Sequence, residues 1–91
     1  MLVNVVGLGY IGLPTALMMA ESGIQVVGTD KNPDKINMLQ KGQLTFDEDG
    51  ISELFNTAVE KGIKFATDYV EAGIYIIAVP TPFNKVSKKV V

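Results

Sequence analysis

The feature that most constrains the fold is the pattern Gly-x-Gly-x-x-Gly near the start of the chain, formed by Gly7, Gly9 and Gly12. It follows a short apolar run, residues 2–6, and a helix-like segment begins directly after it. A second apolar run ends at Asp30, eighteen positions after Gly12. A strand, this glycine spacing, a helix and a later acidic residue form the context in which the pattern predicts a dinucleotide-binding site.

Each glycine of the pattern has its own physical reason. Gly7 ends the strand where the chain must turn, and Gly9 has no Cβ, so the backbone can come close to a diphosphate. Gly12 lets the helix pack close to the strand. The amides of Tyr10 and Ile11 would be unpaired donors at the helix start, so we expect them to bind phosphate oxygens.

Asp30 predicts which nucleotide is bound. Its carboxylate can accept hydrogen bonds from both hydroxyls of an adenosine ribose and would repel a 2′-phosphate, which favours NAD over NADP. The neighbouring Lys31 would weaken this discrimination, but the chain has no arginine to clamp a 2′-phosphate. Asn32 and Pro33 are predicted to be the N-cap and first residue of a helix, which would leave Asp30 free for the ribose.

Hydrophobic periodicity predicts the remaining elements. Strands are expected at 2–6, 25–29, 63–66 and 74–79, and helices at about 11–22, 33–41, 50–61 and 68–72. The unbroken apolar run 74–79 is typical of a strand buried on both faces of a parallel sheet. Right-handed crossovers then give about four parallel strands in the order 3-2-1-4, with helices on both faces. This is a partial Rossmann-type α/β fold.

Composition excludes several classes of function. Cysteine and histidine are absent, which excludes disulfides and a cysteine nucleophile and argues against zinc. The net charge of −2 gives no basic face for nucleic acid. The acids at 47–49 are explained by the preference of helix starts for negative charge, so no metal site is predicted. Without a membrane-spanning run or a signal peptide, we expect a cytoplasmic protein with no membrane partner.

A second candidate site follows the last predicted strand. Thr81 lies between Pro80 and Pro82, beyond the carboxyl end of that strand. Open α/β sheets bind ligands at this edge, where the strand order reverses, and the Thr81 hydroxyl could donate or accept a hydrogen bond there. Equally, Pro-Thr-Pro could be only a stiff exit from the strand.

Three stretches together resemble the start of the UDP-glucose/GDP-mannose dehydrogenase family. They are Gly-Leu-Gly-Tyr-Ile-Gly-Leu-Pro at 7–14, Asp30 with Lys35, and Ala-Val-Pro-Thr-Pro-Phe at 78–83. The first and third most resemble the UDP-N-acetylmannosamine dehydrogenase branch. The resemblance covers about residues 1–84.

The resemblance implies an NAD site and a reaction. NAD would be held by the amides of Tyr10 and Ile11, by Asp30 and Lys35 at the adenosine ribose, and by Thr81. Such enzymes oxidise the C6 alcohol of a nucleotide sugar to a carboxylate for polysaccharide biosynthesis. Their intermediate is a thioester on a cysteine in the C-terminal part.

Because this chain has no cysteine, we expect it to be the NAD-binding half of such an enzyme and inactive alone. Its domain would be a truncated one, residues 1–84, followed by an atypical lysine-rich tail at 85–91. A UDP-sugar would bind only in the full-length enzyme. The outer edge of strand 74–79 would be exposed and could form a homodimer.

Other functions share parts of this pattern. A nucleotide-sensing regulatory domain, such as those attached to potassium channels, has the glycine loop and the acidic residue. Another NAD(P)-dependent dehydrogenase, of the hydroxyacid or 6-phosphogluconate type, has the same fold. A methyltransferase is a third alternative.

Overall fold

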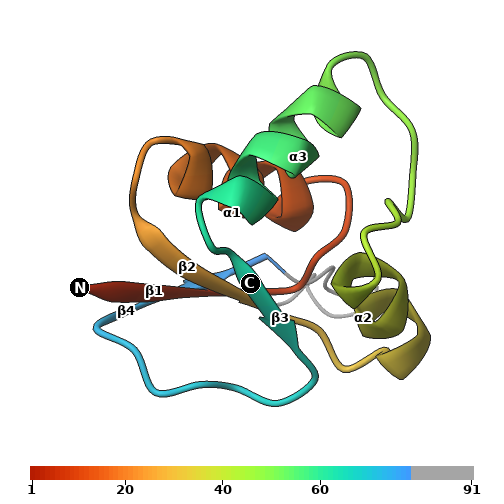
Figure 1. Ribbon diagram of the computed structural model, residues 1–91. Helices are drawn as coiled ribbons and strands as arrows, with labels where there is room; N and C mark the ends of the chain where they lie inside the picture. Colours follow the sequence, from red (N-terminus) through yellow and green to blue (C-terminus); the bar gives the residue numbers. More distant parts are fainter. Residues whose placement is uncertain (79–91) are drawn as a thin grey trace, which may run out of the picture.

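Four parallel strands form one sheet in the order β3-β2-β1-β4 in the computed structural model, which describes residues 1–78 (Figure 1). The elements are β1 Leu2–Val6, α1 Gly12–Glu21, β2 Gln25–Thr29, α2 Pro33–Gln40, α3 Ile51–Glu60, β3 Lys64–Ala66 and β4 Ile74–Ile77. The predicted strand order and parallel pairing are therefore confirmed.

One face of the sheet carries the main hydrophobic core. Figure 1 shows α1 and α3 together on this face. The sheet contributes Val3 and Val5 of β1, and α1 buries a stripe of small and apolar residues against them. That stripe is Gly12, Leu13, Ala16, Leu17 and Ala20. Small residues at four-residue spacing allow the close helix–sheet approach that the sequence predicted.

The opposite face is crossed by the irregular segment between β3 and β4. The prediction of a helix at 68–72 is wrong, because no helix lies between β3 and β4. The amide of Val70 donates to Oδ1 of Asn4 at 3.2 Å, and the amide of Gly73 donates to the carbonyl oxygen of Leu2 at 3.0 Å. These amides bond to β1 rather than to carbonyls four residues earlier, which a helix would require.

Asn4 is a fully buried polar residue in the middle of β1. Its Nδ2 donates to the carbonyl oxygen of Val27 at 3.0 Å and to Oγ1 of Thr29 at 3.1 Å. With Oδ1 accepting from Val70, the side chain joins β1 to β2 and to the crossing segment. Burial of an amide costs little when its hydrogen bonds are satisfied in this way.

β4 is more exposed than its sequence predicts. The exposed fractions of Ile74, Tyr75 and Ile77 are 45%, 47% and 63%, so the expected burial on both faces is wrong. The reason is position, because β4 is the last strand of the sheet and pairs only with β1 among the described residues.

Some sequence predictions fall beyond residue 78. Thr81, the end of the predicted domain at residue 84 and the lysine-rich tail 85–91 lie outside the described residues. Over residues 1–78, no helix is long and apolar enough to cross a membrane.

Candidate functional site

The loop of residues 7–11 connects β1 to α1 at the carboxyl end of the sheet. Gly7 has a φ of 98°, in the left-handed region that favours glycine, which confirms the predicted turn. Gly12 packs so closely that an added Cβ would lie 1.7 Å from the Gly7 carbonyl oxygen. Gly9 has nothing within 4 Å of such a Cβ, so its outer side is open.

The start of α1 offers free hydrogen-bond donors. No side chain caps this helix. Within residues 1–78, the amides of Gly9, Tyr10 and Ile11 donate no hydrogen bond. The side chains of Tyr10 and Ile11 are exposed, and the Tyr10 ring lies 4.6 Å from the ring of Phe46, measured between centroids. Unpaired amides and the helix dipole together favour an anion at this position.

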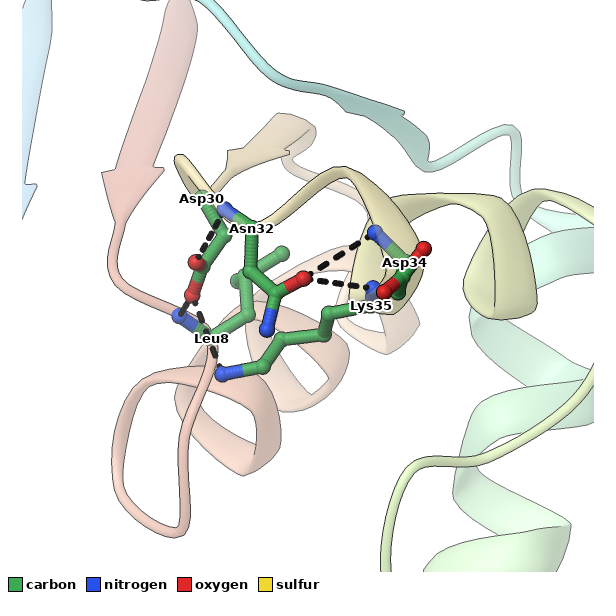
Figure 2. A network of polar contacts seen from close by, with 5 residues as sticks. All are labelled: Leu8, Asp30, Asn32, Asp34 and Lys35. Carbon is green, nitrogen blue, oxygen red and sulfur yellow. Dashed lines mark hydrogen bonds and ion pairs between the residues drawn. The ribbon is translucent and has the colours of Figure 1, made fainter.

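Asp30 lies at the centre of a polar network at the end of β2 (Figure 2). Its Oδ2 accepts from the amide of Leu8 at 2.9 Å and from Nζ of Lys35 at 3.2 Å, while Oδ1 accepts from the amide of Asn32 at 3.0 Å. As predicted, Asn32 and not Asp30 caps α2, but the Asp30 carboxylate already has three partners of its own. The turn after β2 brings the Asn32 amide back to the carboxylate, and the neighbouring β1 brings the glycine loop.

Asn32 has the predicted capping role at the start of α2. Its Oδ1 accepts from the amides of Asp34 and Lys35 at 3.0 and 3.3 Å, and Pro33 is the first helical residue. The side chain of Asn32 therefore caps α2 while its own backbone amide holds Asp30.

The environment of Asp30 keeps its carboxylate ionised. Burial raises the pKa of Asp30, but hydrogen bonds from the Leu8 and Asn32 amides and the Lys35 ion pair together lower it below its ordinary value. The side chain remains 16% exposed. A carboxylate offers about four acceptor positions, and three are used here, so Oδ1 can accept a further bond.

A cavity of about 330 Å³ lies beside this network. It is lined by Val6, Gly7, Leu8, Gly9, Asp30, Lys31, Asn32, Lys35, Thr67 and Tyr69. Four predicted site residues are thus brought together: Gly7, Gly9, Asp30 and Lys35. Three others, Tyr10, Ile11 and Gly12, continue the same loop into α1 without lining the cavity.

Two of the lining residues, Thr67 and Tyr69, come from a segment in which no site residue was predicted. They follow β3, and Nζ of Lys31 lies 5.2 Å from the Tyr69 ring centroid, a cation–π contact between two lining residues. The available signal was positional, because residues after neighbouring parallel strands meet at one edge of the sheet. The incorrect prediction of a helix at 68–72 gave no reason to expect these residues at the ligand-binding edge of the sheet.

The cavity is large enough for a small organic ligand. Its volume lies within the range of small-molecule sites. Among its lining residues are Gly9, whose amide donates no hydrogen bond within residues 1–78, and the ionised acceptor Asp30. No cluster of three or more acidic residues that could hold a metal ion occurs in residues 1–78.

Comparison with known proteins identifies a family of NAD binding domains. Residues 1–90 match the sequence model of the NAD binding domain of the UDP-glucose/GDP-mannose dehydrogenase family. The chain is 46% identical over 79 residues to the UDP-N-acetyl-D-mannosamine dehydrogenase of Methanococcus maripaludis, covering 86% of this chain and 18% of that protein. It is 43% identical over 83 residues to the Escherichia coli K12 enzyme of that name, covering 90% and 20%.

Solved structures agree with the sequence relatives. The native structure of the UDP-N-acetyl-mannosamine dehydrogenase from Staphylococcus aureus has a TM-score of 0.86 and 43% identity, covering 90% of this chain and 20% of that chain. A ternary complex of GDP-mannose dehydrogenase from Pseudomonas aeruginosa has a TM-score of 0.82 and 28% identity, with the same coverage.

The chain spans about a fifth of the length of the relatives that it matches. The match to the family model covers nearly the whole chain, and the strand order of the structure is that of a Rossmann-type NAD-binding fold. The chain belongs to the UDP-glucose/GDP-mannose dehydrogenase family and corresponds to its NAD binding domain.

Proposed function

We propose that this chain is the NAD-binding part of a dehydrogenase that oxidises the C6 alcohol of a UDP-sugar to a carboxylate. One observation carries the proposal: the Gly9 backbone, which leads into the uncapped start of α1, and the ionised Asp30 carboxylate line the same cavity. The names of the relatives support UDP-N-acetylmannosamine as the sugar. Bound NAD supplies the hydride acceptor for such an oxidation.

The diphosphate of NAD is assigned to the glycine loop. The amides of Gly9, Tyr10 and Ile11 are the donors for its oxygens, and the open side of Gly9 leaves room for them. Gly7 and Gly12 act indirectly, because they give the loop its turn and its close contact with β1. Thr81 is proposed as a further contact from sequence alone.

The adenosine ribose is assigned to Asp30 and Lys35. Oδ1 of Asp30 has an acceptor position left for a ribose hydroxyl, and Lys35 brings its ammonium group to Oδ2 of the same carboxylate. A 2′-phosphate would be placed against the Asp30 negative charge, which favours NAD over NADP.

The chain alone is proposed to bind NAD without turnover. The thioester step implied by the family resemblance needs a cysteine, and the 91 residues contain none. The UDP-sugar and the covalent step therefore belong to other parts of a longer enzyme.

Calorimetry with NAD, NADP and S-adenosylmethionine tests this assignment. We expect NAD to bind more tightly than NADP, S-adenosylmethionine not to bind, and Asp30→Ala to weaken NAD binding about tenfold or more. Asp34→Ala, which removes an exposed acid four residues away, is the matched control and should leave NAD affinity unchanged. Binding of S-adenosylmethionine, or full NAD affinity in Asp30→Ala, would contradict the proposal.

Turnover is tested separately. No NADH should form when the chain is mixed with NAD and UDP-N-acetylmannosamine or UDP-glucose. Measurable NADH formation would show that the reaction needs no cysteine from elsewhere and would overturn the proposed division of labour.

We also propose that two copies of the chain can associate through the outer edge of β4. An exposed apolar edge strand is a template for pairing with another chain. Light scattering at increasing concentration should show dimers, and Ile77→Lys should reduce them. Met18→Lys, at an exposed position on α1, is the control. A monomer at all concentrations would contradict this association.

A further inference from the structure

We propose that Asp30 is also a positioning residue for the diphosphate site, because its carboxylate holds the glycine loop in shape through the amide of Leu8. This inference rests on the proposed NAD site. It adds a second role to a residue that the sequence assigned only to the ribose.

Three consecutive residues of β2 and the following turn hold the glycine loop from one side. Leu8 is fully buried against Gly28, where an added Cβ would lie 2.9 and 3.1 Å from the Leu8 Cδ atoms. The Thr29 carbonyl oxygen accepts from the Gly7 amide at 2.8 Å. Oδ2 of Asp30 accepts from the Leu8 amide at 2.9 Å.

The contact to Asp30 is the last anchor before the free donors. Beyond Leu8, the amides of Gly9, Tyr10 and Ile11 have no partner within residues 1–78. Gly9 has the widest backbone freedom of any residue type, so its neighbours must fix its orientation. The Leu8 amide fixes one side, and the bond from the Leu13 amide to the Gly9 carbonyl oxygen, at 3.1 Å, fixes the other.

Asp30 is itself rigid enough to act as an anchor. Figure 2 shows the Asn32 amide on Oδ1 of Asp30 and the Lys35 ammonium group on Oδ2, the oxygen that also accepts from the Leu8 amide. A hydrogen bond to an ionised carboxylate is roughly twice as strong as one between neutral groups. The loop is therefore preorganised before any diphosphate arrives, which reduces the entropic cost of binding.

The two roles of Asp30 can be separated with a cofactor analogue. An NAD analogue whose adenosine ribose lacks both hydroxyls cannot use Asp30 as a ribose acceptor. If Asp30 acted only on the ribose, wild type and Asp30→Ala would bind this analogue equally. We expect Asp30→Ala to bind it about tenfold more weakly, because the loop has lost its anchor. Asp34→Ala should bind it as wild type does.

Hydrogen exchange gives a readout that needs no cofactor. In the cofactor-free chain, the Leu8 amide should exchange about tenfold faster in Asp30→Ala than in wild type. The Val5 amide, in the middle of β1, should be unchanged and reports that the sheet is intact. Should Asp30→Ala fail to fold, Asp30→Asn keeps the size and a neutral acceptor, and a smaller increase of about threefold is expected for Leu8.

The outcomes distinguish this inference from the proposed function. Equal analogue affinities of wild type and Asp30→Ala, or an unchanged Leu8 exchange rate in the folded variant, would overturn the positioning role. If wild type bound no NAD, the proposed function would fail instead. The exchange rate of Leu8 would still decide whether Asp30 anchors the loop.

Discussion

Gly12 packs against Gly7 so tightly that an added Cβ would lie 1.7 Å from the Gly7 carbonyl oxygen. Gly9, two residues after Gly7, has nothing within 4 Å of such a Cβ. Glycines of one sequence pattern therefore meet different physical demands. Gly12 is required by the fold itself, whereas Gly9 leaves space for a ligand.

Gly12→Ala should destabilise the protein by at least about 3 kcal/mol, because the backbone of Gly7 cannot move aside without shifting β1. Gly9→Ala should change the free energy of unfolding by less than about 1 kcal/mol. It should still weaken NAD binding, because its methyl group occupies the open side of the loop. Urea unfolding and calorimetry on both variants measure these effects.

Each of these two variants serves as the control for the other. A Gly9→Ala protein that is as unstable as Gly12→Ala would show that Gly9 is needed for folding. A Gly9→Ala protein that binds NAD like wild type would place the diphosphate elsewhere.

Asn32→Ala should destabilise the protein by about 1 kcal/mol. The variant loses the side-chain oxygen that accepts from the Asp34 and Lys35 amides. Asn32→Ser restores an N-cap acceptor and should recover most of the lost stability. Thermal unfolding of the three proteins measures the effect, and equal stability of Asn32→Ala and wild type would argue against the cap.

The stability supplied by Asp30 should depend on pH. Its pKa in the folded protein is lowered, with the effect of burial outweighed by the Leu8 and Asn32 amides and by Lys35. The unfolded chain therefore takes up the proton more readily than the folded one. The contribution is fully present above the ordinary aspartate pKa of about 3.9 and is lost as the pH falls through the lower folded pKa.

Asp30→Asn tests this pH dependence. The difference in free energy of unfolding between wild type and Asp30→Asn should be largest at neutral pH and should shrink below about pH 4. Urea unfolding at several pH values measures it, with Asp34→Asn as the exposed control. A difference that grows as the pH falls would contradict the sign of the pKa shift.

Asn4→Leu should destabilise the protein by about 1–3 kcal/mol. Leucine has a similar size but leaves the Val70 amide and the Thr29 hydroxyl without their buried partner. Asn37→Leu, at an exposed position on α2, is the matched control. Denaturant unfolding measures the free energy of unfolding of both variants. If Asn4→Leu were as stable as wild type, the hydrogen bonds of Asn4 would make no net contribution to stability.

Local signals in the sequence determined most of the fold. The period of the apolar residues predicted all four strands and three helices, and parallel crossovers set the strand order. Asn32 and Pro33 marked the start of α2 correctly, because capping needs only partners within the next three residues. The glycine pattern and Asp30 were also correctly placed at the cavity, because each directly follows the end of a strand.

Only the tertiary structure decided which polar groups meet. The partners of Asp30 and Asn4 lie 22 and 66 residues away in sequence, at Leu8 and Val70. The bond from Val70 replaces the helix expected at 68–72, and the edge position of β4 exposes a strand whose composition predicts burial. Propensity and periodicity describe a segment alone, whereas hydrogen-bond partners and burial depend on which other segments are packed against it.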